Sequence, residues 1–176
     1  MQKISYEIVS LPEERDQLAD WLAEQPWPFH VCTEMSRDQA LGMIDRGHFR
    51  GPDQESYWIV DDQRKIGLVR LMDLNDIDEG NPMFDLRLVE SMRGRGLGQF
   101  TVRWLTNLLF NRYPQLNRLA GNTRDDNRAM QKVFERCGYI KEGCFREAWP
   151  AASGRPYDSV YYGILRNEWR QQLEQL

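Results

Sequence analysis

The sequence predicts a single domain of the mixed α/β or α+β class that spans residues 1–176. Segments with the alternating apolar pattern of strands are interspersed with segments whose apolar residues recur at helical spacing. The chain has 176 residues, of which 41% are hydrophobic and 28% are charged. This is the balance of one globular domain with its own core. No linker-like segment divides the chain, so one domain is the simplest organisation.

The first half of the chain is predicted to form a strand, two helices and a hairpin. Residues Ile4–Val9 alternate as a strand does. Pro12 and the two glutamates after it are typical of a helix start, and Pro26 ends that helix. Ser36 is placed to cap a second helix that runs to Phe49. Two hairpin strands follow at 57–60 and 66–72, around a turn at 61–64.

The second half is predicted to alternate strands and helices. Phe84–Val89 is a strand because its even-numbered residues are apolar, whereas Asp85 and Arg87 point the other way. The later segments are a turn at 93–98, an amphipathic helix from residue 97, a strand at 116–123, a helix at 127–137, strands at 139–148 and 157–165, and a helix at 166–176. Asp125 or Asp126 can cap the start of the helix at 127–137, and Gly138 ends it.

Composition narrows the class of protein. The formal net charge of −4 gives no global basic field for nucleic acid or anionic lipid. No apolar run has the length of a membrane helix, and the charged start of the chain is not a secretory signal. Cys32, Cys137 and Cys144 are odd in number and widely spaced, so we expect no disulfide framework and no metal site. These features predict a cytoplasmic protein in which each cysteine is a small buried residue.

A turn rich in glycine and arginine separates the strand at 84–89 from the amphipathic helix. Gly94, Gly96 and Gly98 let the backbone come close to a ligand, and amides at the helix start can point at an anion. Arg93 and Arg95 add charge suited to phosphate. The turn lacks the ending of a Walker loop and the spacing of a dinucleotide fingerprint. It predicts a pyrophosphate site, the alternative being a tight turn with solvated arginines.

Three separated motifs make the chain resemble the GNAT N-acetyltransferase superfamily. Arg93-x-x-Gly96-x-Gly98 resembles the acetyl-coenzyme A pyrophosphate loop of that family. The helix that opens at 126–129 and closes at 136–139 is similar to its second motif. The closing segment 154–169 is similar to the branch that acetylates the N-termini of ribosomal proteins. The resemblance implies a central mixed sheet of about six to seven strands flanked by helices, with splayed strands at the cofactor site.

The resemblance also implies how acetyl-coenzyme A would be held. The strand before the turn splays at its end, where its backbone pairs with the pantetheine arm and an amide polarises the thioester carbonyl. Backbone amides of the turn hold the pyrophosphate, and the arginines add charge. Asn127 matches an Asn that bonds the pantetheine, the alternative being a helix N-cap. The implied cofactor residues are Leu88, Val89, Arg93, Gly94, Arg95, Gly96, Leu97, Gly98 and Asn127.

Two residues depart from the family pattern. Phe134 stands where many members carry a Tyr that protonates the departing thiolate, and phenylalanine has no proton to give. Tyr139, Tyr161 or Tyr162 is a candidate replacement, the alternative being a thiolate that leaves unaided, since the pKa of a free thiol is about 8.5. Met130 stands where the family prefers a small residue, which indicates altered packing under the cofactor.

Acetyl transfer to an amine also needs a base. Asp85 lies on the strand that would carry the acetyl group, and it is either this base or a solvated acid paired with Arg70 or Arg87. Asn122 is either an acceptor contact or a strand-end amide that bonds backbone. Residues 27–30 form either an aromatic acceptor wall or a lid of the core, with His30 as a lesser candidate for the base.

We therefore expect an N-acetyltransferase that moves an acetyl group from acetyl-CoA to a primary amine in a ternary complex. The acceptor is a protein N-terminus or a small amine. The alternatives are a non-catalytic acyl-CoA sensor or partner-binding module, and a phosphate-binding protein for ordinary nucleotides that would bind ATP or NAD instead. We expect no metal, membrane or nucleic-acid partner, and a monomer or homodimer.

Overall fold

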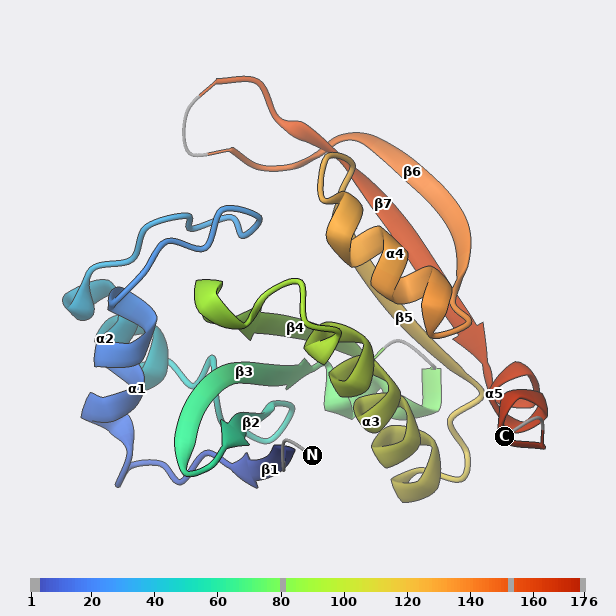
Figure 1. Ribbon diagram of the computed structural model, residues 1–176, viewed down its shortest axis with the longest axis horizontal. Coiled ribbons are helices and arrows are strands. Elements are labelled where there is room, and N and C mark those ends of the chain that lie inside the picture. The colour runs from blue at the N-terminus through green and yellow to red at the C-terminus, as the bar shows by residue number, and fades with distance from the viewer. Residues whose placement is uncertain (1–3, 80–81, 152–153, 175–176) are drawn as a thin grey trace. The chain divides into compact units, whose positions relative to one another are not determined.

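The computed structural model describes residues 4–79, 82–151 and 154–174. Their helices and strands follow the predicted order (Figure 1). The strands are β1 (Ile4–Ile8), β2 (Glu55–Asp61), β3 (Arg64–Met72), β4 (Met83–Leu88), β5 (Arg118–Arg124), β6 (Ile140–Trp149) and β7 (Tyr157–Leu165). The α-helices are α1 (Arg15–Ala23), α2 (Arg37–Asp45), α3 (Leu97–Arg112), α4 (Arg128–Arg136) and α5 (Arg166–Glu174), with short 3-10 helices at Leu74–Glu79 and Glu90–Met92.

The predicted α+β class is confirmed, and the strands divide into two sheets. The first has the order β1-β2-β3-β4 and the second the order β5-β7-β6. β4 and β5 are thus edge strands of different sheets, where the sequence predicted one central sheet. The chain likewise divides into two compact units. The first comprises β1–β3, α1, α2 and β4 from Phe84 onward, and the second comprises α3–α5 with β5–β7.

In the first unit, two helices pack beside each other and contribute to one apolar core with the sheet (Figure 1). β2 pairs antiparallel with both β1 and β3, and it is buried along almost its whole length. Leu22 of α1, Trp58 of β2 and Leu68 of β3 are fully buried in this core. The predicted cap of α2 is confirmed, because Ser36 and Gln39 form a reciprocal capping box.

In the second unit, β7 is the central strand and pairs antiparallel with β5 and β6. α3 and α4 lie beside each other. The buried side chains include Leu105 and Phe110 of α3, Phe134 of α4 and Ile164 of β7. Arg166 donates hydrogen bonds to the carbonyls of Leu116, Phe110 and Tyr113, which fixes the start of α5 to the end of α3.

Three local predictions need correction or a limit. Asn127 caps α4, whereas Asp126 forms an ion pair with Arg124 at 2.7 Å. Of the three cysteines only Cys137 is buried; Cys32 is half-buried and Cys144 is exposed. The last helix is described to Glu174, and the final two residues of its predicted range lie outside the described residues.

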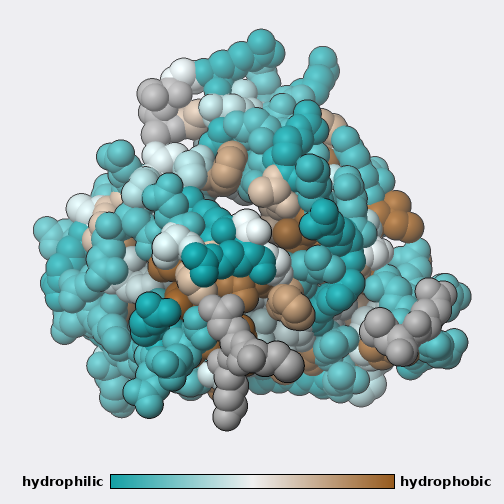
Figure 2. All heavy atoms as spheres, in the orientation of Figure 1, coloured by the Kyte–Doolittle hydropathy of each residue, from teal (hydrophilic) through white to brown (hydrophobic). Residues whose placement is uncertain are grey.

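The visible surface is predominantly hydrophilic, with small apolar areas scattered over it (Figure 2). Across the parts of the chain that the structure describes, no helix combines the length and apolar character needed to cross a membrane.

Candidate functional site

The glycine-rich turn leads into α3 without any side chain capping the helix. Residues 93–96 are exposed. Gly94 and Gly96 have φ angles of 73° and 81°, which residues with a side chain rarely adopt. A Cβ built at Gly96 would find its nearest neighbour, Phe100 Cε2, 3.9 Å away, so the space outside the turn is open. The N-cap of α3 is Gly96, which has no side chain to accept from the first amides of the helix, whereas Ser36 and Asn127 cap α2 and α4; α1 also lacks a side-chain cap. This arrangement fits a pyrophosphate group.

Asn127 uses both ends of its side-chain amide where β5 passes into α4. Its Oδ1 accepts from the amide of Met130 at 3.2 Å, as an N-cap does. Its Nδ2 donates to Thr123 Oγ1 at 3.0 Å. Gln131 holds the same turn by donating to the carbonyls of Arg124 and Asp125. The N-cap alternative for Asn127 is therefore present, and its bond to pantetheine stays a prediction.

Replacing Asn127 separates these two roles. Asn127→Ala is expected to lower the free energy of unfolding by about 1 kcal/mol, because α4 loses its cap. Asn127→Ser restores a capping oxygen but supplies no amide. If the amide also bonds the cofactor, both variants weaken acetyl-CoA binding about tenfold. Thermal melts and calorimetric titrations measure the two effects; a destabilised Asn127→Ala variant with unchanged affinity for acetyl-CoA removes Asn127 from the cofactor site.

At the end of β4, two backbone amides already have acceptors. Val89 N–H donates to the carbonyl of Ile66 at 3.0 Å, and Glu90 N–H donates to Gln25 Oε1 at 2.9 Å. Val89 also packs against the core of the first unit. The implied roles of Leu88 and Val89 in cofactor binding stay predictions, and an oxyanion contact by Val89 N–H would require its bond to Ile66 to break.

Asp85 lies on β4 in a cluster of basic groups. His30 Nε2 is 2.7 Å from Asp85 Oδ1, and Arg87 Nε is 3.2 Å from Oδ2. Burial alone raises the pKa of Asp85, but the charges of Arg87, His30 and Arg70 outweigh this and hold the pKa well below its usual range. The ion pair with Arg87 weighed from the sequence is thus present. A carboxylate so stabilised is ionised but only weakly basic.

Of the three tyrosines considered as acids, Tyr139 and Tyr162 are buried in the second unit, whereas Tyr161 is half-buried. Burial raises the pKa of Tyr139. Its hydroxyl lies 2.8 Å from Thr106 Oγ1, which itself donates to the carbonyl of Val102, so Tyr139 is the donor. Burial and the nearby Glu135 raise the pKa of Tyr162, whose hydroxyl is 3.4 Å from Glu135 Oε1. Both tyrosines keep their protons at neutral pH, and the acid role of either stays a prediction.

Asn122 and Trp27 have partners that the sequence did not specify. Asn122 Nδ2 donates to Ser159 Oγ at 3.1 Å, a cross-strand bond between β5 and β7. Trp27 is 1% exposed and donates to the carbonyl of Leu22, so it belongs to the core.

His30, three residues later, is the functional candidate that sequence reasoning underrated. Its partner Asp85 is 55 residues away, and no local pattern connects the two.

The fold, with two sheets and a glycine turn before α3, is that of an acetyltransferase. The acetyltransferase (GNAT) domain model matches residues 7–140, and the chain belongs to this family.

Curated relatives point to different acceptors. The chain is 28% identical over 104 residues to "Putative ribosomal N-acetyltransferase YdaF" of Bacillus subtilis (strain 168), covering 58% of this chain and 56% of that protein. It is 30% identical over 140 residues to the histidine N-acetyltransferase of Oreochromis niloticus, covering 72% of this chain and 41% of that protein. The chain thus spans about half the length of the curated relatives that it matches.

Solved structures show the same fold. A mutant form of the spermidine/spermine N-acetyltransferase SpeG from Vibrio cholerae superposes with a TM-score of 0.77 at 18% identity, covering 97% of this chain and 98% of that one. A SpeG structure described as dodecameric has a TM-score of 0.75 at 16% identity, covering 96% and 97% of the two chains.

Proposed function

We propose that residues 1–176 form a single N-acetyltransferase domain that transfers an acetyl group from acetyl-CoA to a primary amine. The observation that carries this proposal is the open, uncapped start of α3 behind a turn of glycines with positive φ, within a chain that belongs to the GNAT family. Direct transfer in a ternary complex lets the protein accelerate the reaction by holding both substrates in line.

The cofactor roles follow from the chemistry of each group. Acetyl-CoA supplies the activated acetyl thioester. The amides of residues 95–98 and the charges of Arg93 and Arg95 hold the pyrophosphate. The residues assigned to pantetheine are Leu88 and Val89, through their backbone, and Asn127, through its side-chain amide. A raised pKa suits Tyr139 or Tyr162 to remain protonated until a thiolate needs the proton.

The acceptor is a small amine or a protein N-terminus. The name of one curated relative specifies a ribosomal acceptor and that of the other specifies histidine. We infer a cytoplasmic site of action from the cysteines, none of which is in a disulfide within the described residues.

A calorimetric titration with acetyl-CoA, with ATP and NAD as controls, tests the proposal. We expect selective micromolar binding of acetyl-CoA. Replacing Arg93 and Arg95 together by Gln should weaken this binding about tenfold or more, because two charge-assisted contacts are lost. Arg103→Gln is the matched control, since Arg103 is an exposed arginine of α3 outside the turn. Equal binding of ATP and acetyl-CoA would contradict the proposal.

Thiol release in the presence of spermidine, histidine and an N-terminal peptide then separates an enzyme from a sensor. One observation favours the sensor: Phe134, which has no proton to give, stands where many members of the family carry the tyrosine that protonates the thiolate. Acetyl-CoA binding without turnover of any of these amines would support that second function.

A further inference from the structure

His30 and Asp85 form a hydrogen-bonded pair inside the first unit. His30 lies in the connection between α1 and α2, and Asp85 lies on β4. The side chains are 20% and 17% exposed, and Nε2 of the imidazole is 2.7 Å from Oδ1 of the carboxylate. This short contact between partly buried groups fixes the orientation of the imidazole ring and of the carboxylate plane. None of the roles described above depends on this pair.

The charge of Asp85 determines which nitrogen of His30 carries the proton. Because Arg87, His30 and Arg70 keep Asp85 ionised, its oxygen can only accept a hydrogen bond. Nε2 is therefore the protonated nitrogen, and in the neutral imidazole Nδ1 holds the lone pair. Within the described residues Nδ1 has no hydrogen-bond partner. The lone pair of this nitrogen is thus not committed to another of the described groups.

Both oxygens of Asp85 are already engaged. Oδ1 accepts from His30, and Oδ2 accepts from Arg87, whose side chain is 7% exposed. Arg87 in turn lies over the ring of Trp27, 5.3 Å from its centroid. The rings of His30 and Trp27 are arranged edge to face, with their centroids 6.2 Å apart. Since Trp27 is anchored in the core, the four side chains hold one another in a fixed arrangement.

We propose that His30 is the base that deprotonates the acceptor amine and that Asp85 is its positioning residue. This inference rests on the acetyltransferase function proposed above. An N–H bond of the acceptor ammonium breaks, and its proton forms an N–H bond at Nδ1 of His30. The freed lone pair of the amine then attacks the acetyl carbonyl carbon and forms the C–N bond. The C–S bond breaks, coenzyme A leaves as the thiolate, and the second proton of the amine nitrogen passes to this thiolate. The imidazolium returns its proton to solvent after the product leaves.

Asp85 acts through His30 in two ways. It selects the tautomer in which Nδ1 can accept a proton, and its negative charge stabilises the imidazolium that results. The other charged groups around the pair are Arg87 on β4 and Arg70 on β3, which oppose a second positive charge and limit how strongly the imidazolium is favoured. Because Nδ1 is buried, the acceptor must displace the groups that cover it.

The tautomer can be measured without any acceptor. The chain has two histidines, so His48→Gln leaves His30 as the one imidazole. In ¹⁵N NMR of that variant at neutral pH, we expect a protonated Nε2 and an unprotonated Nδ1. In the His48→Gln, Asp85→Asn double variant, the preference for the Nε2 proton should weaken, because the carboxylate that accepts it is gone. A protonated Nδ1 in the neutral ring would overturn the assignment.

Kinetics test the catalytic role. For whichever of spermidine, histidine or the N-terminal peptide is acetylated, His30→Gln should lower kcat/KM about 100-fold or more. Asp85→Asn should move the acidic limb of the kcat/KM profile to lower pH, which a purely structural role would not do. His48→Gln is the control and should match the wild type. Thermal melts and acetyl-CoA titrations show that each variant is folded and binds the cofactor.

The outcomes separate this inference from the proposed function. If the wild type does not bind acetyl-CoA, the proposed function fails. If the wild type binds acetyl-CoA but acetylates none of the amines, both the acetyltransferase activity and the assignment of His30 as its base fail, whereas the proposed binding of acetyl-CoA is supported. If it turns over and folded His30→Gln is as active as the wild type, only the assignment of His30 is wrong. An Asp85→Asn variant with an unshifted profile overturns the positioning role.

Discussion

Phe134→Ala is expected to lower the free energy of unfolding by about 3–5 kcal/mol. Phe134 is fully buried on α4. Its ring stacks on Tyr162 of β7 with centroids 4.9 Å apart and planes at 9°, and it lies 5.4 Å from the ring of Tyr139. Alanine would leave a cavity between α4 and the rings of Tyr162 and Tyr139.

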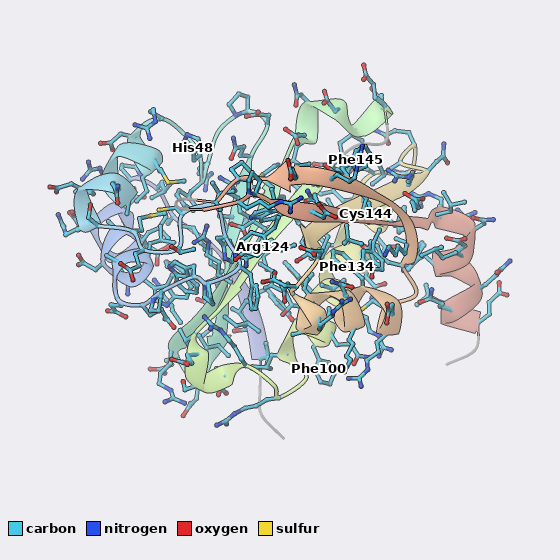
Figure 3. The ribbon with its side chains drawn as sticks, turned by 90° about the horizontal axis from the view of Figure 1, so that it is seen from above. His48, Phe100, Arg124, Phe134, Cys144 and Phe145 are labelled. Carbon is cyan, nitrogen blue, oxygen red and sulfur yellow. The ribbon has the colours of Figure 1, made fainter. Side chains whose placement is uncertain are left out.

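Urea denaturation of Phe134→Ala measures this loss, and Phe100→Ala provides the matched control. Phe100 is a phenylalanine of the same unit that is 65% exposed on α3 (Figure 3). Its replacement should change the free energy of unfolding by less than about 0.5 kcal/mol. Phe134→Leu should fall between the two, because it retains most of the buried volume. Similar losses for Phe134→Ala and Phe100→Ala would contradict the packing that the structure shows.

The same packing bears on catalysis. By the resemblance, Phe134 stands where many members of the family carry an acid, and in the structure its ring is part of the core of the second unit. The ring of Tyr162 stacks on that of Phe134, and the acid role of Tyr162 stays a prediction. Tyr162→Phe would preserve this stacking and remove only the hydroxyl, which makes it the cleaner of the two tyrosine substitutions.

Local sequence patterns predicted the elements of this chain well because they reflect local periodicity and end signals. β7 has the predicted bounds. Ser36 caps the start of α2, and Gly138, with its positive φ, follows the end of α4, as expected. The cap of α4 was harder to assign, since Asp125, Asp126 and Asn127 are adjacent and each is a good N-cap residue. The exact register of the turn decides among them, and Arg124 takes Asp126 as its ion-pair partner.

Candidate site residues could be predicted from the sequence where they are neighbours in a local motif. They could not be predicted where folding brings together residues that are far apart in the chain. The glycine turn is read directly from the order strand, turn, helix. The pairing of His30 with Asp85 depends on tertiary packing across 55 positions. The division into two sheets was likewise invisible, because alternation within β4 or β5 does not specify the neighbouring strand. Burial of Tyr139 depends on α3, which supplies Thr106 as its acceptor.

Asp85→Leu should have an effect as large as that of Phe134→Ala, through charge instead of volume. Removing one partner of a buried ion pair costs about 3–5 kcal/mol, because the other charge is left without compensation. Here Arg87 would remain buried beside His30. Adding Arg87→Met should restore much of the loss, since the pair is then replaced by apolar groups. Asp45→Leu is the control, because its ion pair with Arg15 lies at the surface and should matter far less.

The stability difference between the wild type and Asp85→Leu should also depend on pH in a defined direction. The pKa of Asp85 is lower in the folded chain than its ordinary value of 3.8. A group of this kind contributes its full stability above the unfolded pKa and loses it as the pH falls toward the folded pKa. Urea denaturation at several pH values should therefore give a difference that becomes smaller as the pH falls below about 4. A difference that keeps growing below about pH 4 would mean that the carboxylate is destabilised in the fold, and the ion pairs drawn around Asp85 would then be wrong.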